Sequence, residues 1–323
     1  MPQEVIKTAM LPYLLLIVGF VLLIKGADFF VDGASSIAAK LKVPSLIIGL
    51  TVVSIGTSLP EAAVSVSSSL KGSNDISLGN VIGSNLFNLL MVVGFSSAIL
   101  PIVTDNDILK RDMPVNIAAT VILFLMLLDG TLSRTEAAIL LVLLVAYILI
   151  LIRNALKNRT QEEKETKLLS WTKSLVFVVL GAAAIIFGGD MVVNNAKIIA
   201  LNLGMGETLV GLTIVAIGTS LPELVTSIIA ARKGDSGIAM GNVMGSSIFN
   251  IFFILGMSGV ISPLKTDPSF FIDIGILIGV CLLMLLFAFT KKKTSRLEGI
   301  TAIMLYATYT AYIIMRSYHI WIF

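Results

Sequence analysis

The hexapeptide GTSLPE occurs twice in this chain, at residues 56–61 and again at residues 218–223. Each copy lies within a long apolar segment and is followed at the same distance by a second shared motif, GNVIGSNLFN or GNVMGSSIFN. Both motifs repeat with a single offset of 162 residues, so the chain consists of two related halves. A glutamate in the middle of a membrane-length segment is costly unless it meets a partner or faces water. The repetition therefore makes Glu61 and Glu223 the first candidates for functional residues.

The composition is typical of a polytopic membrane protein. Hydrophobic residues make up 56% of the chain and charged residues only 13%, whereas a soluble domain has about 25% charged residues. The apolar runs are about 20 residues long and continuous, which favours transmembrane helices over a barrel. The single cysteine, Cys281, excludes an internal disulfide, and His319 is the only histidine. We therefore expect no enzyme, no cofactor, no nucleic-acid partner and no obligatory protein partner.

The apolar runs predict ten membrane spans, five in each half. They are 10–30, 43–70, 77–100, 113–130, 135–154, 172–195, 205–232, 239–262, 269–290 and 298–316. Because five is odd, the second half must enter the membrane in the opposite sense to the first, which predicts an inverted repeat. The expected fold is an all-α integral membrane protein with two inverted five-helix repeats.

The motifs divide this fold into three segments. The first repeat is expected at residues 1–155, with its motifs in spans two and three, and the second at residues 172–323, with its motifs in spans seven and eight. Residues 156–171 form a short linker that is too small for a folded regulatory domain. We predict that this linker is cytoplasmic.

The distribution of basic residues predicts the orientation in a cell membrane. If the N-terminus is outside, sixteen lysines and arginines fall in inner loops and six in outer segments. Inner loops of membrane proteins carry the excess of these residues. Both termini are therefore expected to be extracellular.

The first motif supplies oxygen ligands. Pro60 and Pro222 have no N–H, so each leaves a carbonyl four residues earlier without its helical partner. On helical spacing, polar side chains or backbone carbonyls gather on the face of each glutamate. These residues are Ser54, Thr57 and Ser58 beside Glu61, and Ala216, Thr219 and Ser220 beside Glu223. Carboxylate, hydroxyl and carbonyl oxygens are the donors that Ca²⁺ and Na⁺ prefer.

The second motif supplies a facing helix. Its polar residues are spaced i, i+4 and i+8, as Asn80, Ser84 and Asn88 in one half and Asn242, Ser246 and Asn250 in the other. Its paired glycines permit close helix approach. Two ionised glutamates carry a charge of −2, which one Ca²⁺ or several Na⁺ ions can neutralise. A site that accepts either load is a basis for exchange, and moving Ca²⁺ against more than two Na⁺ is electrogenic.

The paired GTSLPE and GN(V/I)xGSxxxN motifs resemble the alpha-repeats of the sodium/calcium exchanger family, within the cation/Ca²⁺ antiporters. The resemblance covers essentially the whole chain and implies that Ca²⁺ and Na⁺ are transported substrates. It also implies an ion-binding set made of Glu61, Glu223, Thr57, Ser58, Thr219, Ser220, Ser84, Ser246, Asn88, Asn250 and the carbonyls of Ser54 and Ala216.

One position departs from part of the family. Some relatives, including potassium-dependent ones, have an aspartate where this chain has Asn250, and Asn88 is also a neutral amide. This departure argues against K⁺ co-transport. Proton-coupled relatives have a GNxxE pattern that is absent here, although a glutamate can carry a proton. A proton-coupled or broader cation/Ca²⁺ exchanger therefore remains the main alternative, with a passive cation channel and a membrane-embedded enzyme behind it.

Overall fold

The structure is a computed structural model that describes residues 3–72, 74–157, 168–204 and 216–317. Within these residues, seven helices are long and apolar enough to cross a membrane, and one bent helix pair brings the number to eight. The chain is thus an all-helical membrane protein, as its composition predicts. The division into ten spans, part of which falls on residues 205–215 outside the described ranges, stays a prediction.

The helices follow the expected spans in order, although their ends differ and several spans are subdivided. The first half contains α1 Gln3–Leu41, α2 Ser45–Ile48, η1 Gly49–Val53, α3 Ser54–Thr57, α4 Leu59–Leu70, α5 Asn74–Phe87, η2 Asn88–Val92, α6 Val93–Ile99, η3 Ile108–Asp112, α7 Met113–Met126 and α8 Arg134–Lys157. The second half contains α9 Trp171–Asn202, α11 Ala216–Gly218, α12 Leu221–Arg232, α13 Ser236–Phe249, η5 Asn250–Leu255, α14 Gly256–Ile261, α15 Ser269–Lys291 and α16 Arg296–Ser317. The elements labelled η are π-helical turns that continue the neighbouring helices.

Two short strand pairs, which the sequence does not predict, join the halves. Their strands are β1 Ile102–Val103, β2 Thr131–Leu132, β3 Leu264–Lys265 and β4 Lys293–Thr294. In the first pair Ile102 lies opposite Thr294, and in the second Leu132 lies opposite Leu264. The 162-residue offset relates the two pairs: Ile102 corresponds to Leu264, and Thr294 corresponds to Leu132. The two halves therefore contact each other reciprocally.

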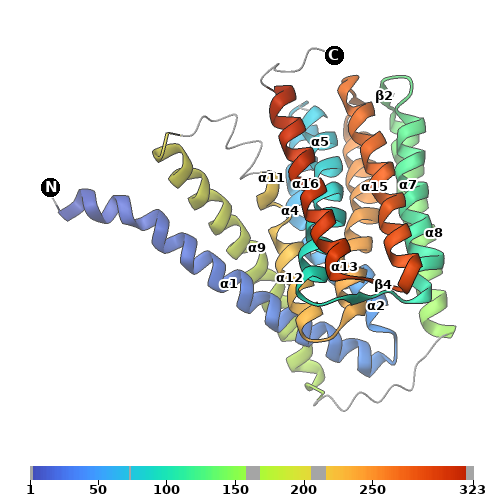
Figure 1. Cartoon of the computed structure of the whole chain (residues 1–323), viewed down its shortest axis with the longest axis horizontal. Coiled ribbons are helices and arrows are strands. Elements are labelled where there is room, and N and C mark those ends of the chain that lie inside the picture. The colour runs from blue at the N-terminus through green and yellow to red at the C-terminus, as the bar shows by residue number, and fades with distance from the viewer. Residues whose placement is uncertain (1–2, 73, 158–167, 205–215, 318–323) are drawn as a thin grey trace.

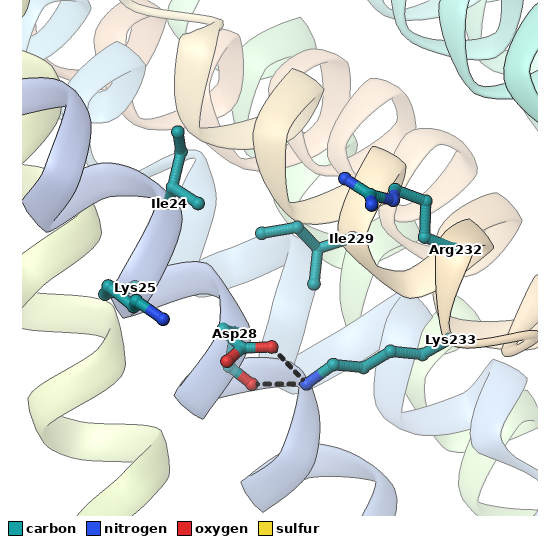
Figure 2. Close-up of a pocket in the computed structure, with 6 residues that line it drawn as sticks. All are labelled: Ile24, Lys25, Asp28, Ile229, Arg232 and Lys233. Carbon is teal, nitrogen blue, oxygen red and sulfur yellow. Dashed lines mark hydrogen bonds and ion pairs between the residues drawn. The ribbon is translucent and has the colours of Figure 1, made fainter.

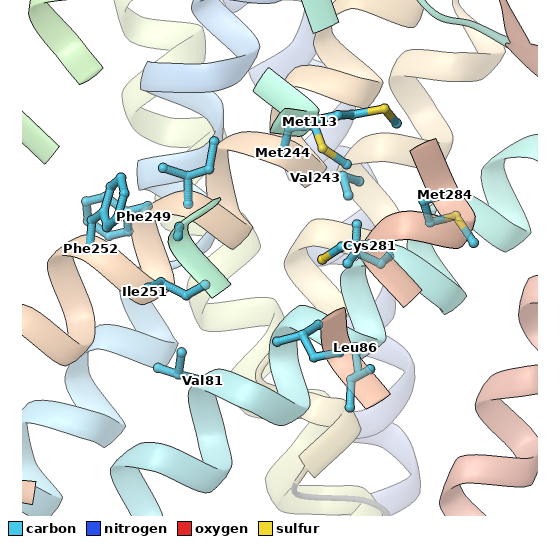
Figure 3. Packing of buried hydrophobic residues seen from close by; sticks show 14 of the residues in the cluster. Val81, Leu86, Met113, Val243, Met244, Phe249, Ile251, Phe252, Cys281 and Met284 are labelled. Carbon is cyan, nitrogen blue, oxygen red and sulfur yellow. The ribbon is translucent and has the colours of Figure 1, made fainter. Parts of the chain in front are cut away.

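The hydrophobic core surrounds the two helices that carry the second motif. Its largest cluster includes Leu86 of α5, Met244 of α13 and Met284 of α15, all at most 3% exposed (Figure 3). A second cluster joins α1 to α12 and includes Phe30 and Ala230. The motif helices are thereby held in the interior while α8 and α16 keep broad apolar faces exposed.

Helices α1 and α9 form a separate layer beside the bundle. They lie side by side, and toward the end where the C-terminus is drawn they lean away from the other helices (Figure 1). Their contact depends on glycine: a Cβ atom added at Gly181 would lie 2.7 Å from the backbone nitrogen of Phe30 and 2.8 Å from the carbonyl oxygen of Gly26. Without side chains at these positions the two backbones approach closely.

Candidate ion-binding site

Each GTSLPE motif sits at a break in a membrane helix. Helices α3 and α4 meet at Ser58 with a bend of 50°. Ser58 has backbone angles of φ −85° and ψ 7°, and Ser220 in the second copy has φ −94° and ψ 7°. A proline at the second position of the following helix cannot continue the hydrogen-bond ladder of the preceding one, so the sequence itself explains the break. The break places Glu61 and Glu223 in the first turns of α4 and α12.

The two glutamates belong to one buried cluster. The Ser58 hydroxyl donates to Oε1 of Glu223 at 2.9 Å, and the Ser220 hydroxyl donates to Oε1 of Glu61, also at 2.9 Å. Both glutamates are 0% exposed. Each carboxylate is therefore held by the serine of the other repeat, inside the protein and away from lipid.

The asparagines of the second motif tie the facing helices to these glutamates. Nδ2 of Asn80 donates to the carbonyl oxygen of Glu61 at 3.2 Å and to Oγ of Ser65 at 2.9 Å. Asn242 makes the same two contacts in the second half, at 3.3 and 2.9 Å. These bonds are interhelical and reach the backbone of the glutamate, so we assign both asparagines a role in positioning it.

A further amide network, centred on Asn85, lies where the two copies of the second motif meet. Nδ2 of Asn250 donates to Oγ of Ser84 at 3.2 Å and to Oδ1 of Asn85 at 3.0 Å, and Asn85 in turn donates to the carbonyl of Ser247 at 3.1 Å. Sequence reasoning missed Asn85, because the repeat offset pairs it with a serine and the shared pattern does not mark it. Ser84 also lies 3.4 Å from Oε1 of Glu61.

Three of the remaining predicted ligands, Ser54, Thr57 and Ser246, are linked to one another by hydrogen bonds. The carbonyl of Ser54 accepts from the hydroxyl of Thr57 at 3.3 Å and from that of Ser246 at 3.5 Å. Thr57 also donates to Oδ1 of Asn242 at 3.0 Å. The predicted carbonyl of Ala216 belongs to the first residue of α11.

Several buried oxygen atoms of the two motifs have no hydrogen-bond partner among the described residues. They are Oε2 of Glu61, Oε2 of Glu223, Oδ1 of Asn88, Oδ1 of Asn250 and Oγ1 of Thr219. Buried polar atoms are normally paired, because leaving them unpaired costs free energy. A set of unpaired hard oxygen atoms beside two carboxylates fits a cation that supplies the missing partner.

The ligand set is poor in carboxylates. In the described ranges no group of three or more His, Cys, Asp or Glu side chains could hold a metal ion. A cation here would be held by two carboxylates and by neutral oxygens of serine, threonine and asparagine. Sites of this type suit Na⁺ and Ca²⁺ better than the softer transition metals.

The backbone around Asn88 and Asn250 departs from the α-helix. Both residues begin π-helical turns, η2 and η5, at equivalent positions of the two halves. Such turns are rare and often mark functional sites, because they redirect a side chain and loosen backbone carbonyls. The sequence contains no signal for this feature.

Glycines of the second motif allow the close helix approach that the site requires. A Cβ atom at Gly245 would lie 2.6 Å from Oγ of Ser54 and 2.7 Å from the carbonyl oxygen of Leu50, and one at Gly241 would lie 2.7 Å from that of Leu46. The expected close approach is thus confirmed for α13. The segment that would face the equivalent glycines of α5 lies in residues 205–215, outside the described ranges.

The sequence as a whole matches a family model described as sodium/calcium exchanger protein, over residues 11–153 and 173–315. The two matched segments start and end 162 residues apart, the same offset that relates the motifs. The chain belongs to the sodium/calcium exchanger family. The family and the structural neighbours are exchangers, not enzymes.

Similar proteins match most of the chain. Inner membrane protein YrbG of Escherichia coli is 40% identical, over 79% of this chain and 81% of that protein. Sodium/calcium exchanger MaX1 of Methanosarcina acetivorans is 36% identical, over 92% of this chain and 97% of that protein. The solved structure of the sodium-calcium exchanger NCX_Mj, soaked with zero Na⁺ and Ca²⁺, superposes with a TM-score of 0.84 and 33% identity, covering 94% of this chain and 99% of that one.

Proposed function

We propose that the chain is a secondary antiporter that exchanges Na⁺ for Ca²⁺ by alternating access. The observation that carries this proposal is the reciprocal pair of bonds from Ser58 to Glu223 and from Ser220 to Glu61. These bonds bring two fully buried carboxylates into one cluster, and the second oxygen of each carboxylate, Oε2, has no partner among the described residues. Membership of the exchanger family and similarity to MaX1 and NCX_Mj support cation/Ca²⁺ antiport.

The proposed ion ligands come equally from the two halves. They are Glu61, Thr57, Ser58, Ser84, Asn88 and the Ser54 carbonyl, together with Glu223, Thr219, Ser220, Ser246, Asn250 and the Ala216 carbonyl. Eight of the residues that contribute side chains are 0% exposed: Glu61, Thr57, Ser58, Asn88, Glu223, Ser220, Ser246 and Asn250. A cation entering the cluster would pair the carboxylate oxygens that the serines leave free.

Charge balance sets the proposed ion load. Two ionised glutamates offer a charge of −2, so one Ca²⁺ neutralises them, and several Na⁺ ions can occupy neighbouring subsites instead. Exchange of Ca²⁺ for more than two Na⁺ makes the cycle electrogenic. Asn88 and Asn250 are neutral, and without an additional carboxylate we propose that transport is independent of K⁺.

The proposed architecture has ten spans in two inverted repeats, at residues 1–155 and 172–323, joined by a cytoplasmic linker at residues 156–171. Both termini would be extracellular in a cell membrane, as the distribution of basic residues indicates. The broken helices and α5 with α13 would form the ion-holding core. The α1–α9 layer, packed glycine against glycine beside the core, would move between the outward and inward states.

Uptake of ⁴⁵Ca²⁺ into proteoliposomes tests the proposal. Vesicles loaded with Na⁺ and diluted into Na⁺-free medium should take up Ca²⁺, and vesicles without a Na⁺ gradient should not. An imposed pH gradient without Na⁺ should give no uptake. Ca²⁺ uptake driven only by the pH gradient would show that the protein exchanges H⁺, not Na⁺, for Ca²⁺. Ca²⁺ uptake without a gradient of either ion would indicate a passive channel.

Two further conditions test the finer claims. Adding K⁺ on either side should leave the Na⁺-driven rate unchanged. A proton ionophore combined with a pH step imposes a membrane potential, and the direction of the step sets its sign. Potentials of opposite sign should change the Ca²⁺ uptake rate in opposite directions, because net charge moves in each cycle. A rate that requires K⁺ or ignores the potential would contradict the corresponding claim while leaving exchange itself intact.

A further inference from the structure

An ion-pair cluster ties α1 to the end of α12. Nζ of Lys233 lies 2.6 Å from Oδ1 of Asp28 and 2.7 Å from Oδ1 of Asp32, and it also donates to the carbonyl of Asp28 at 2.9 Å. The three residues are partly exposed, and the cluster borders a cavity of about 360 Å³ lined also by Lys25 and Arg232 (Figure 2). The bonds connect the peripheral α1–α9 layer to the ion-holding core.

The repeat provides a second copy of this cluster. The 162-residue offset places Lys71 at the position of Lys233, Asp190 at that of Asp28 and Asn194 at that of Asp32. Lys71 follows the last residue of α4 just as Lys233 follows the last residue of α12. The two helices end toward opposite ends of the bundle (Figure 1), so the two clusters face opposite sides of the membrane.

In this structure only one of the two clusters is closed. Lys71 and Asp190 take part in none of the ion pairs found among the described residues, and both are exposed. The helix contacts show the same asymmetry, because α1 packs against α12 whereas α9 and α4 make no comparable contact. Figure 1 shows α9 leaning away from the bundle toward the end at which α4 terminates.

We propose that Lys233 with Asp28 and Asp32, and Lys71 with Asp190, are two alternating latches of the transport cycle. The first is closed here, and the second closes when the α1–α9 layer moves to the opposite state. In an inverted repeat the two halves exchange conformations between the states, so a contact present on one side should be replaced by its counterpart on the other. This inference rests on the alternating-access part of the proposed function, and these five residues position helices without touching the ions.

The latches are unequal. Lys233 meets two carboxylates, whereas Lys71 would meet one, because Asn194 stands in place of Asp32. A partly exposed ion pair shifts an equilibrium by about two- to five-fold at most. The sequence thus favours the state seen here, with the Lys233 latch closed, by a small factor that allows transport to proceed in both directions.

Spin-label distance measurements test the latches. Labels attached at Leu70→Cys on α4 and Ile198→Cys on α9, both exposed positions, report the gap on the Lys71 side. The protein is placed in nanodiscs, and the fraction at short distance is measured. Lys233→Gln should raise that fraction by about two- to five-fold, and Lys71→Gln should lower it.

Lys71→Gln is the decisive variant. Lys71 makes no ion pair among the described residues, so if the lysine had no role in the opposite state, its removal would leave the distances unchanged. Asn194→Asp, which completes the weaker latch, should raise the short-distance fraction. Lys265→Gln removes an equivalent exposed charge and should leave the distribution unchanged. Equal shifts for the two latch lysines, or no shift in either, would overturn the proposal.

The distance measurement does not depend on which ions are transported. Opposite shifts combined with a failure of Na⁺-driven Ca²⁺ uptake would keep the latches and remove the proposed substrates. Normal uptake combined with unchanged distances would remove the latches alone. The two proposals therefore fail separately.

Discussion

The hydroxyl of Ser58 lies 2.9 Å from Oε1 of Glu223, so the serine of one GTSLPE copy binds the glutamate of the other. The exchanged bond, from the second serine to the first glutamate, has the same length. The two halves therefore build one hydrogen-bonded cluster rather than two separate ones. Each proposed ligand side chain in one half has a counterpart in the other half, so a substitution at one position can be compared with the equivalent substitution in the other half.

Neutralising either glutamate should abolish Ca²⁺ transport. Glu61→Gln and Glu223→Gln keep the size of the side chain but remove half of the charge that balances Ca²⁺. Uptake of ⁴⁵Ca²⁺ should fall to background in both variants, while size-exclusion profiles in detergent stay those of the folded protein. Asp129→Asn, at an exposed position whose carboxylate accepts from the Thr131 N–H, should transport normally. Retained exchange in either glutamine variant would refute the assigned site.

Removing either cross-repeat serine should weaken the site by similar amounts. Ser58→Ala and Ser220→Ala each delete a hydrogen bond to a carboxylate, which contributes about 1.5–3 kcal/mol. The half-saturating Ca²⁺ concentration should rise about tenfold or more in both variants. Ser67→Ala, on an exposed face of α4, should have no effect. A loss confined to one of the two serines would argue against reciprocal use of the repeats.

Adding a carboxylate at Asn250 should change ion preference. In Asn250→Asp the side chain keeps its size, and the cluster gains a negative charge on a side chain whose Oδ1 has no partner among the described residues. We expect an altered affinity for Ca²⁺ or Na⁺, or a new dependence on K⁺. Exchange rates measured across a matrix of the three ions will detect either effect. Asn202→Asp on the exposed end of α9 is the control, and identical behaviour of both variants would place Asn250 outside the ion shell.

The contact between α13 and the first broken helix should not tolerate a methyl group. Gly245→Ala would place Cβ 2.7 Å from the carbonyl oxygen of Leu50, and overpacking of this kind costs about 1–3 kcal/mol. The melting temperature in detergent should fall. Gly275→Ala has open space around it, and because alanine favours the helix it should be neutral or slightly stabilising. Equal melting temperatures would show that the two helices separate easily.

The sequence predicted the membrane class, the duplicated halves and the buried glutamates, because these features depend on local chemistry. A run of about 20 apolar residues has few alternatives to a membrane helix. The proline beside each glutamate breaks the hydrogen-bond ladder of that helix because it has no N–H. The resemblance of both motifs to one family added the ligand set and the ions. The family is confirmed, whereas the individual ligands remain predictions.

The tertiary structure decided which residues meet. Neither the bond between Ser58 and Glu223 nor the contact of Asn85 with Asn250 follows from spacing along one helix, because each joins elements about 160 residues apart. The π-helical turns at Asn88 and Asn250 depend on packing as well. Only the folded chain shows that Lys233 pairs with Asp28 and Asp32 while its counterpart Lys71 takes part in none of the ion pairs found among the described residues, because the repeat in the sequence does not say which copy of the contact forms.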